Sequence, residues 1–146
     1  MAQAAASGAG VEPTVSVHLK HAADTHAADV LAADGFVFST PENLAGMSGQ
    51  LKDFFDRTYY AVLDRLAGRP YALLVCAGSD GYNAVRQIER IVTGWRLTAM
   101  AEPVVVCTHA QTPEEILRPK ILAAQDLQRC EMVGGTLAAG MALGVF

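Results

Sequence analysis

The chain has 146 residues, of which 51% are hydrophobic and 18% are charged, and its formal net charge is −4. This composition excludes a disordered chain, and the mild negative charge argues against general attraction to nucleic acid. The length suits one domain that can bury a core without disulfides. We therefore expect a single domain over residues 1–146.

The cysteines and the apolar segments favour a cytoplasmic protein. The three cysteines Cys76, Cys107 and Cys130 are odd in number, and no two have CxxC spacing, which indicates reduced thiols. Residues 1–10 carry no Lys or Arg and no long apolar run, so they do not resemble a signal peptide. No apolar stretch is long enough to span a bilayer, so we expect no membrane partner.

The first half of the chain predicts two strands and a helix. Residues 1–12 are interpreted as a residual helix or a disordered start. Alternating apolar residues predict a strand at Val15–Leu19, and a short helical or irregular crossover follows at Asp24–Leu31. A second strand, Gly35–Ser39, is apolar on both faces, as buried parallel strands are. Helical spacing of apolar residues then predicts a helix over about Ser48–Leu66.

The second half continues the alternation. Strands are predicted at Tyr71–Cys76 and Pro103–Cys107, with a helix between them over Asn83–Leu97. Thr112–Glu115 has the pattern of a capping box with proline at the first helical position. The last helix is expected over about Ala123–Leu143. Strands joined by helical crossovers predict an α/β fold with a parallel sheet covered on both faces, whose ligands bind at the carboxyl ends of the strands.

Three loops follow those carboxyl ends. Thr40–Gly49 combines a proline, two glycines and Asn43 and Met47, which are suited to facing a ligand. Cys76–Asn83 has two glycines and a tyrosine that suit the face of a flat ring, and Thr108–Gln111 carries His109, a residue type that often serves as an acid or base. Each loop also suits an ordinary turn, with Ser48 capping one helix and Ser79 or Asp80 the next. On that interpretation, His109 is a solvated surface histidine.

No other constellation indicates catalysis or a metal. His18, His21 and His26 have spacings of three and five residues, which match no metal signature, so we expect surface residues. No nucleophile with a matching base and no phosphate-binding glycine motif is present. We therefore expect no catalytic side chain and no metal.

Two segments resemble a known family. Ala33–Asn43, followed by Met47–Arg57, is similar to flavodoxin-like FMN reductases and quinone reductases, and Leu66–Ala72 continues the likeness. The resemblance implies a flavodoxin-like three-layer sandwich, FMN at the carboxyl ends of the strands, and NADPH or NADH as substrate. The redox chemistry then belongs to the flavin, and the electrons pass to flavin or quinone acceptors. The implied cofactor-binding residues are Thr40, Pro41, Glu42, Asn43, Leu44, Gly78, Ser79, Asp80, Gly81 and Tyr82.

The chain departs from that family in two places. Ser39 and Thr40 stand where Gly and Thr are usual. In addition, Val15–Leu19 resembles the family's second strand, so the first strand and its Ser/Thr-rich phosphate loop have no counterpart. We expect an amino-terminally shortened chain that must re-pair its strands, borrow one from another subunit, or be unstable.

These departures keep three functions open. The first is an NAD(P)H-dependent FMN or quinone reductase acting on a small-molecule electron acceptor. The second is a flavodoxin-type electron carrier without its own substrate, and the third is a truncated remnant that no longer binds FMN. A homo-oligomer is also expected, with an exposed aromatic face around Phe54–Tyr60 as its contact.

Overall fold

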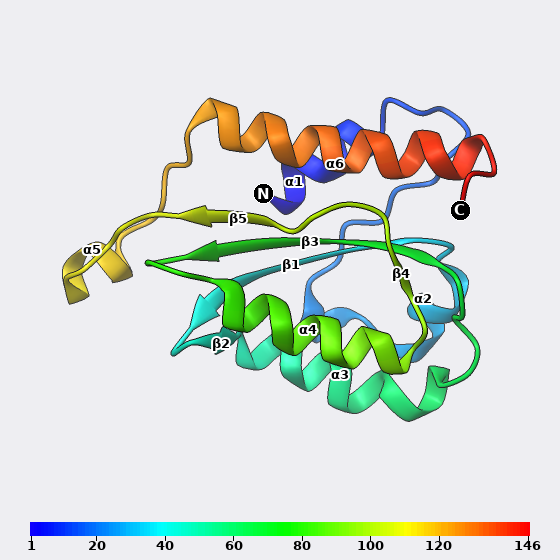
Figure 1. Cartoon of the computed structure of the whole chain (residues 1–146), viewed down its shortest axis with the longest axis horizontal. Helices are drawn as coiled ribbons and strands as arrows, with labels where there is room; N and C mark the ends of the chain where they lie inside the picture. The colour runs from blue at the N-terminus through cyan, green and yellow to red at the C-terminus, as the bar shows by residue number, and fades with distance from the viewer.

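The computed structural model describes residues 1–146 as one mostly parallel sheet with helices on both faces (Figure 1). Its strands are β1 (Phe36–Asn43), β2 (Gly46–Met47), β3 (Pro70–Ala77), β4 (Thr98–Ala99) and β5 (Val104–Cys107). Its helices are α1 (Ala2–Ala9), the 3-10 turn η1 (Ala22–Asp24), α2 (Ala27–Ala32), α3 (Gly49–Val62), α4 (Tyr82–Gly94), α5 (Pro113–Leu117) and α6 (Ala124–Ala142).

Strand β3 is the centre of the sheet. β1 runs parallel to one of its edges, from the pair Phe36 and Tyr71 to the pair Pro41 and Cys76. β4 and β5 run parallel to its other edge, and β2 only folds back on the end of β1 as a short antiparallel hairpin. Because β3 is covered on both faces, nearly all of its side chains are buried, which explains its continuous apolar sequence.

The two faces of the sheet have separate cores. α3 and α4 cover one face with a large aromatic cluster, in which the rings of Phe55 and Trp95 lie 5.3 Å apart. The Trp95 indole is fully buried, and its N–H donates to the backbone oxygen of Tyr59 at 3.2 Å. α1 and α6 cover the other face with a smaller core around Leu74 and Cys130. All three cysteines are free thiols.

Helix α1 lies directly against α6, because glycines remove the side chains between them. A Cβ at Gly134 would lie 1.9 Å from the backbone oxygen of Ala5, and a Cβ at Gly8 would lie 2.0 Å from that of Glu131. No side chain fits at either position, so the contact depends on both glycines. The amino-terminal residues therefore form a packed helix, which agrees with the helical reading of residues 1–12.

The predicted strand at Val15–Leu19 is wrong as an assignment of secondary structure. The segment is extended, and its side chains alternate, but the backbone from Ser16 to Lys20 makes no backbone hydrogen bond. The physical reason is that no strand lies beside it, since a cavity separates it from β1. Periodicity identifies an extended segment but does not identify its partner.

The expected aromatic contact face around Phe54–Tyr60 is also wrong in part. Phe54 and Phe55 point into the core and are buried, and only Tyr60 is strongly exposed. The homo-oligomer therefore stays a prediction without this support. α3 also ends at Val62 rather than Leu66, although Leu66 still packs into the core.

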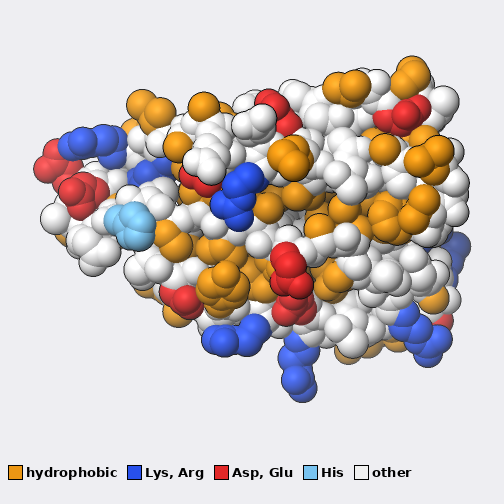
Figure 2. Space-filling view, turned by 45° about the horizontal axis from the view of Figure 1, so that its top comes forward, with side chains coloured by type: hydrophobic (Ala, Val, Ile, Leu, Met, Phe, Trp, Pro, Cys, Tyr) orange, Lys and Arg blue, Asp and Glu red, His pale blue; other side chains and the backbone are white.

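Figure 2 shows one face of the molecule, on which apolar side chains are interspersed with isolated charged ones. No continuous patch of Lys and Arg is visible on that face. None of the helices has both the length and the apolar character that crossing a membrane requires.

Candidate functional site

Three strand ends meet at one edge of the sheet. β1, β3 and β5 run in the same direction, so the loops that follow them leave from the same edge. The third loop is tied to the second, because the N–H of Thr108 donates to the Ala77 oxygen and the N–H of His109 to the Gly78 oxygen, both at 2.8 Å. The three predicted loops therefore form one continuous surface.

The first predicted loop is a β-hairpin with a two-residue turn. β1 continues to Asn43, the chain turns at Leu44 and Ala45, and β2 returns at Gly46. Leu44 and Ala45 have φ of 49° and 61°, the left-handed values of the turn type that matches hairpin twist. Ser48 then caps α3 as expected, since its hydroxyl accepts from the Leu51 N–H at 3.3 Å.

Helix α4 fixes this hairpin from the side. The Asn83 amide donates to the backbone oxygen of Ala45, and the N–H of Met47 donates to Oε1 of Gln87 at 3.0 Å. At the base of the hairpin, the buried Thr40 hydroxyl accepts from the Ser48 N–H at 3.1 Å and donates to the Pro41 oxygen at 2.9 Å. The tip is thus held in place by side chains from an element that begins almost 40 residues later.

The apolar surface at the tip comes from a different residue than expected. Met47 was expected to face a ligand, but it is buried in the core with only 7% of its surface exposed. Leu44 is instead fully exposed at the turn, and the ring of Tyr82 is 55% exposed at the start of α4. Two apolar side chains therefore face solvent, one on each of the two loops.

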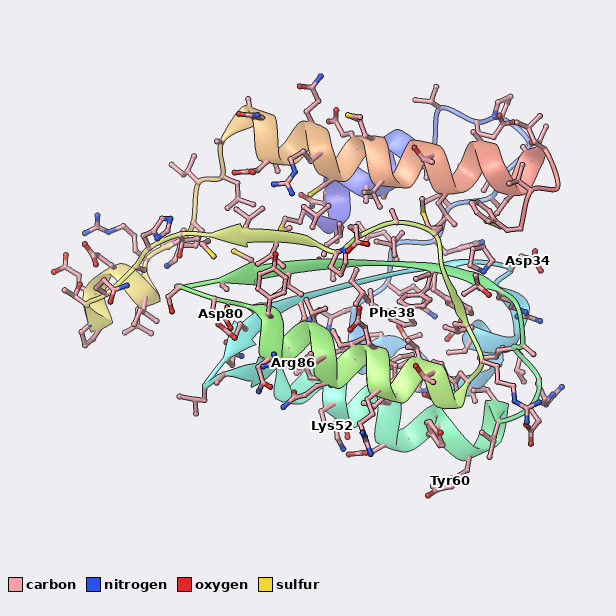
Figure 3. The ribbon with its side chains drawn as sticks, in the orientation of Figure 1. Asp34, Phe38, Lys52, Tyr60, Asp80 and Arg86 are labelled. Atoms are coloured by element: carbon pink, nitrogen blue, oxygen red, sulfur yellow. The ribbon has the colours of Figure 1, made fainter.

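The second loop depends on Gly81. Its φ is 79°, and a Cβ there would lie 2.7 Å from Cγ1 of Val105. Gly81 occupies the N-cap position of α4, so the expected cap by Ser79 or Asp80 is wrong, and neither side chain bonds the helix. Asp80 lies at this edge together with Arg86, which extends from the first turns of α4 (Figure 3).

The Cys76 thiol at this edge is not activated. Burial raises the pKa of the Cys76 thiol, which keeps it protonated at neutral pH. Cys107 contacts the backbone oxygen of Ser79 with a sulfur to oxygen distance of 3.4 Å. No group of three His, Cys, Asp or Glu side chains is placed to hold a metal ion. His109 is exposed beside the second loop and contacts no second catalytic group.

The residues fit the ring of a flavin better than its phosphate. The hairpin, which Asn83 and Gln87 fix, and the Gly78–Tyr82 loop each expose one apolar side chain, Leu44 and Tyr82, as a wall beside a flat ring needs. Helix α1 opens with Ala2, Gln3 and Ala4, which have no hydroxyls, and its N-cap makes no side-chain hydrogen bond. That helix start therefore lacks the Ser and Thr side chains expected around a phosphate.

Together, the fold and the position of the loops define a flavodoxin-like α/β protein. The solved structures support this class. A flavodoxin from the domain Archaea superposes with a TM-score of 0.74 at 17% identity, covering 96% of this chain and 87% of that one. An NADPH-quinone reductase from P. pentosaceus gives a TM-score of 0.61 at 16% identity, over 94% of this chain and 88% of that one.

The chain belongs to the NADPH-dependent FMN reductase family, whose model matches residues 9–112. A probable NAD(P)H dehydrogenase (quinone), FQR1-like 2, of Arabidopsis thaliana is 41% identical over 56 residues. That match covers 38% of this chain and only 20% of the relative's length. The family and the flavodoxin-like fold predicted from Ala33–Arg57 are thus confirmed, while the ten flavin-contact residues implied by the resemblance stay predictions.

Proposed function

We propose that this chain is an FMN-binding oxidoreductase domain that transfers electrons from NADPH or NADH to flavin or quinone acceptors. The observation that carries the proposal is the pair of fixed walls at the carboxyl edge of the sheet, the Pro41–Leu44 hairpin arm and the Gly78–Tyr82 loop. Membership of the family implies FMN and NAD(P)H as its redox groups.

In this proposal, the protein binds and orients the ring but supplies no catalytic side chain. The backbone of Pro41–Leu44 and the exposed Leu44 side chain hold one side, and Gly78–Tyr82 holds the other. The bound FMN supplies the hydride and electron chemistry. The bonds from Asn83 and Gln87 keep the hairpin in position before the ring arrives, which lowers the entropic cost of binding.

The test is a titration of the purified chain with FMN, followed by visible absorbance and flavin fluorescence. Saturable binding is expected, and Leu44→Asp should weaken it by about tenfold, because the change places a carboxylate against an apolar ring. Leu143→Asp is the matched control, since Leu143 is also exposed but follows α6 outside these loops. Equal effects of the two substitutions, or no saturable binding, would contradict the proposed site.

A flavodoxin-type electron carrier is the second candidate. The likeness to the archaeal flavodoxin covers 96% of this chain and 87% of that one. An assay of NADPH oxidation in the presence of FMN and a small quinone distinguishes the reductase from the electron carrier. Turnover that depends on the chain supports the reductase, and FMN binding without turnover supports the carrier.

A further inference from the structure

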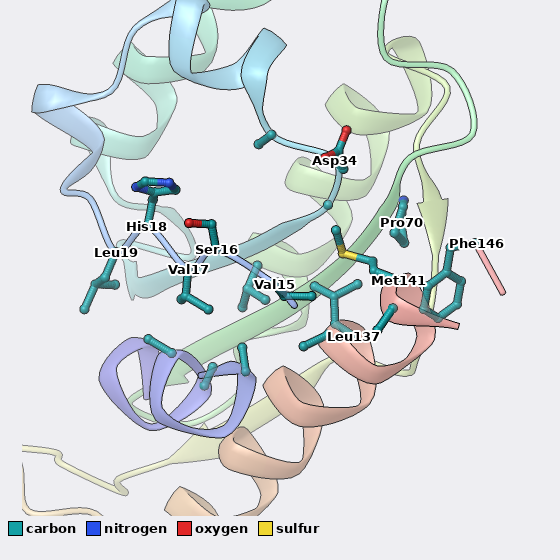
Figure 4. A pocket seen from close by; sticks show the side chains of 18 of the residues that line it. Val15, Ser16, Val17, His18, Leu19, Asp34, Pro70, Leu137, Met141 and Phe146 are labelled. Atoms are coloured by element: carbon teal, nitrogen blue, oxygen red, sulfur yellow. The ribbon is translucent and has the colours of Figure 1, made fainter. Parts of the chain in front are cut away.

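The segment Gln111–Ile121, which we call the α5 arm, stands apart from the rest of the chain. It follows β5 at the carboxyl edge of the sheet, forms α5 and returns to α6, so that α5 projects beyond the ends of the strands (Figure 1). Every residue of the arm is exposed, and α5 buries none of its side chains. The extended segment Val15–Leu19, by contrast, lines a cavity together with Leu137 and Met141 of α6 (Figure 4).

The hydrogen bonds of the arm all lie within the arm. The Glu115 carboxylate accepts from the backbone N–H groups of Gln111 and Thr112 at 2.9 and 3.1 Å. The Lys120 ammonium donates to the backbone oxygen of Arg118 at 2.6 Å and to carbonyl groups of α5. No hydrogen bond to the body of the domain has to break when the arm moves, so it can move as one unit.

A single residue at each end connects the arm to the body. The His109 N–H is bonded to the second loop, and the Gln111 N–H is bonded inside the arm, so Ala110 is the joint between them. His109 itself has a left-handed φ of 55°. At the other end, Leu122 packs against the smaller core, and Ile121 before it is 98% exposed. Residues at the ends of an element commonly absorb the backbone rotation of a hinge.

The arm carries large apolar side chains that cover nothing in the chain. Ile116 and Leu117 of α5 are 57% and 84% exposed. A cavity of about 380 Å³ lies between the arm and the body, lined among others by Thr108–Ala110 and by residues 118–123. The arm therefore has no packed interface to lose when it moves, and its apolar side chains gain free energy where they become covered.

The proposed flavin site lies within reach of the arm. β3 separates β1 from β5, so the hairpin on β1 lies two strand spacings from β5, or about 10 Å. The two residues before α5 and the five residues of α5 together extend about 14 Å from Ala110, at about 3.3 Å per extended residue and about 1.5 Å per helical residue. The arm is therefore long enough to cross the site to the hairpin tip, where Leu44 is fully exposed.

We propose that the α5 arm is a lid that closes over FMN and the nicotinamide between the hairpin and the Gly78–Tyr82 loop. This inference rests on the proposed function. In the closed state, Ile116 and Leu117 face the bound rings and, together with Leu44 and Tyr82, exclude water from them. Because α5 lies beyond residue 112, where the match to the family model ends, membership of the family assigns it no role.

Trypsin tests the lid on the full chain, because its cleavage after Lys120 reports access to the arm. Arg118 is followed by proline and resists trypsin, so Lys120 is the cleavage point of the arm. Saturating FMN with NADP⁺, which cannot donate hydride, should slow this cleavage at least about fivefold, since proteolysis follows the population of the open form. Cleavage after Arg96, at the amino edge of the sheet, is the internal control and should change less than about twofold, because the lid does not cover it.

Two double variants test which side chains hold the lid closed. Ile116→Asp with Leu117→Asp places carboxylates against the bound rings, so the slowing at Lys120 should fall below about twofold with both ligands saturating. Ile116→Leu with Leu117→Ile is the matched control, which keeps both side chains apolar and should keep the slowing. Both positions are exposed in the free chain, so neither double variant disturbs the core.

The outcomes distinguish the lid from the proposed function. Absence of saturable FMN binding in the absorbance titration would overturn both. Saturable FMN binding with unchanged cleavage after Lys120, or loss of the slowing in both double variants, would overturn the lid alone. Equal slowing at Lys120 and Arg96 would also overturn it, since ligand binding then stabilises the whole fold. Slower cleavage at higher chain concentration without ligand, together with a dimeric mass, would instead assign the arm to a second copy.

Discussion

The conformation of Gly81 is the sharpest local requirement of the proposed flavin site. Gly81 has a left-handed φ of 79° where the second loop enters α4. A Cβ there would lie 2.7 Å from Cγ1 of Val105 and 3.1 Å from Cβ of Ala77. Both neighbours are on strands of the sheet, so neither can move far without disturbing the ladder. Gly81→Ala is therefore expected to combine backbone strain with overpacking.

Gly68 separates these two effects. Its φ is 84°, but a Cβ there would have no neighbour within 4 Å. A left-handed conformation costs an ordinary residue about 1–2 kcal/mol, so Gly68→Ala should lower the free energy of unfolding by about that amount. Overpacking adds about 1–3 kcal/mol, so Gly81→Ala should lower it by about 2–5 kcal/mol. The free energy of unfolding of a domain is typically about 5–15 kcal/mol, so both variants should still fold.

Urea unfolding measures both variants, with the midpoint shift interpreted at an unchanged m-value. FMN affinity should fall for Gly81→Ala, because the Gly78–Tyr82 wall is displaced, and should be unchanged for Gly68→Ala. Equal losses of stability in Gly81→Ala and Gly68→Ala would show that the Cβ contacts at Gly81 cost nothing. Unchanged FMN affinity in a clearly destabilised Gly81→Ala would refute the placement of the second wall.

Two further predictions concern stability alone. Gly134→Ala should destabilise the chain by about 1–3 kcal/mol, because its Cβ would clash with the backbone oxygen of Ala5. The same change should speed hydrogen exchange throughout α1. Gly49→Ala is the control, since a Cβ there meets open space, and it should be neutral or stabilising. The Lys20 ammonium and the backbone N–H of His26 lower the pKa of Asp29 in the folded chain. The Asp29 carboxylate therefore stabilises the fold at any pH above its unfolded-state pKa of about 3.9, and this stabilisation is lost as the pH falls through the lower folded-state pKa. Unfolding midpoints of Asp29→Asn should therefore change less than those of the parent chain between neutral and acidic pH, and an unaltered pH profile would contradict this role.

The sequence predicts the elements whose signals are local. The predicted apolar run Tyr71–Cys76 follows Gly68 and Pro70 and comes before Gly78, and the structure has β3 at Pro70–Ala77. Thr112 and Glu115 form the predicted capping box, with the Glu115 N–H bonded to the Thr112 hydroxyl at 3.2 Å. These features depend on neighbours in the chain, so a pattern of residue types suffices to find them.

The hairpin tip could not be predicted in this way. Leu44 and Ala45 occupy left-handed positions that normally favour glycine or asparagine, so the turn has no sequence signal. Its partners Asn83 and Gln87 lie about 40 residues away, and only the packing of α4 beside the hairpin brings them there. Likewise, Val15–Leu19 carries a strand pattern, but pairing depends on a neighbour that periodicity does not describe.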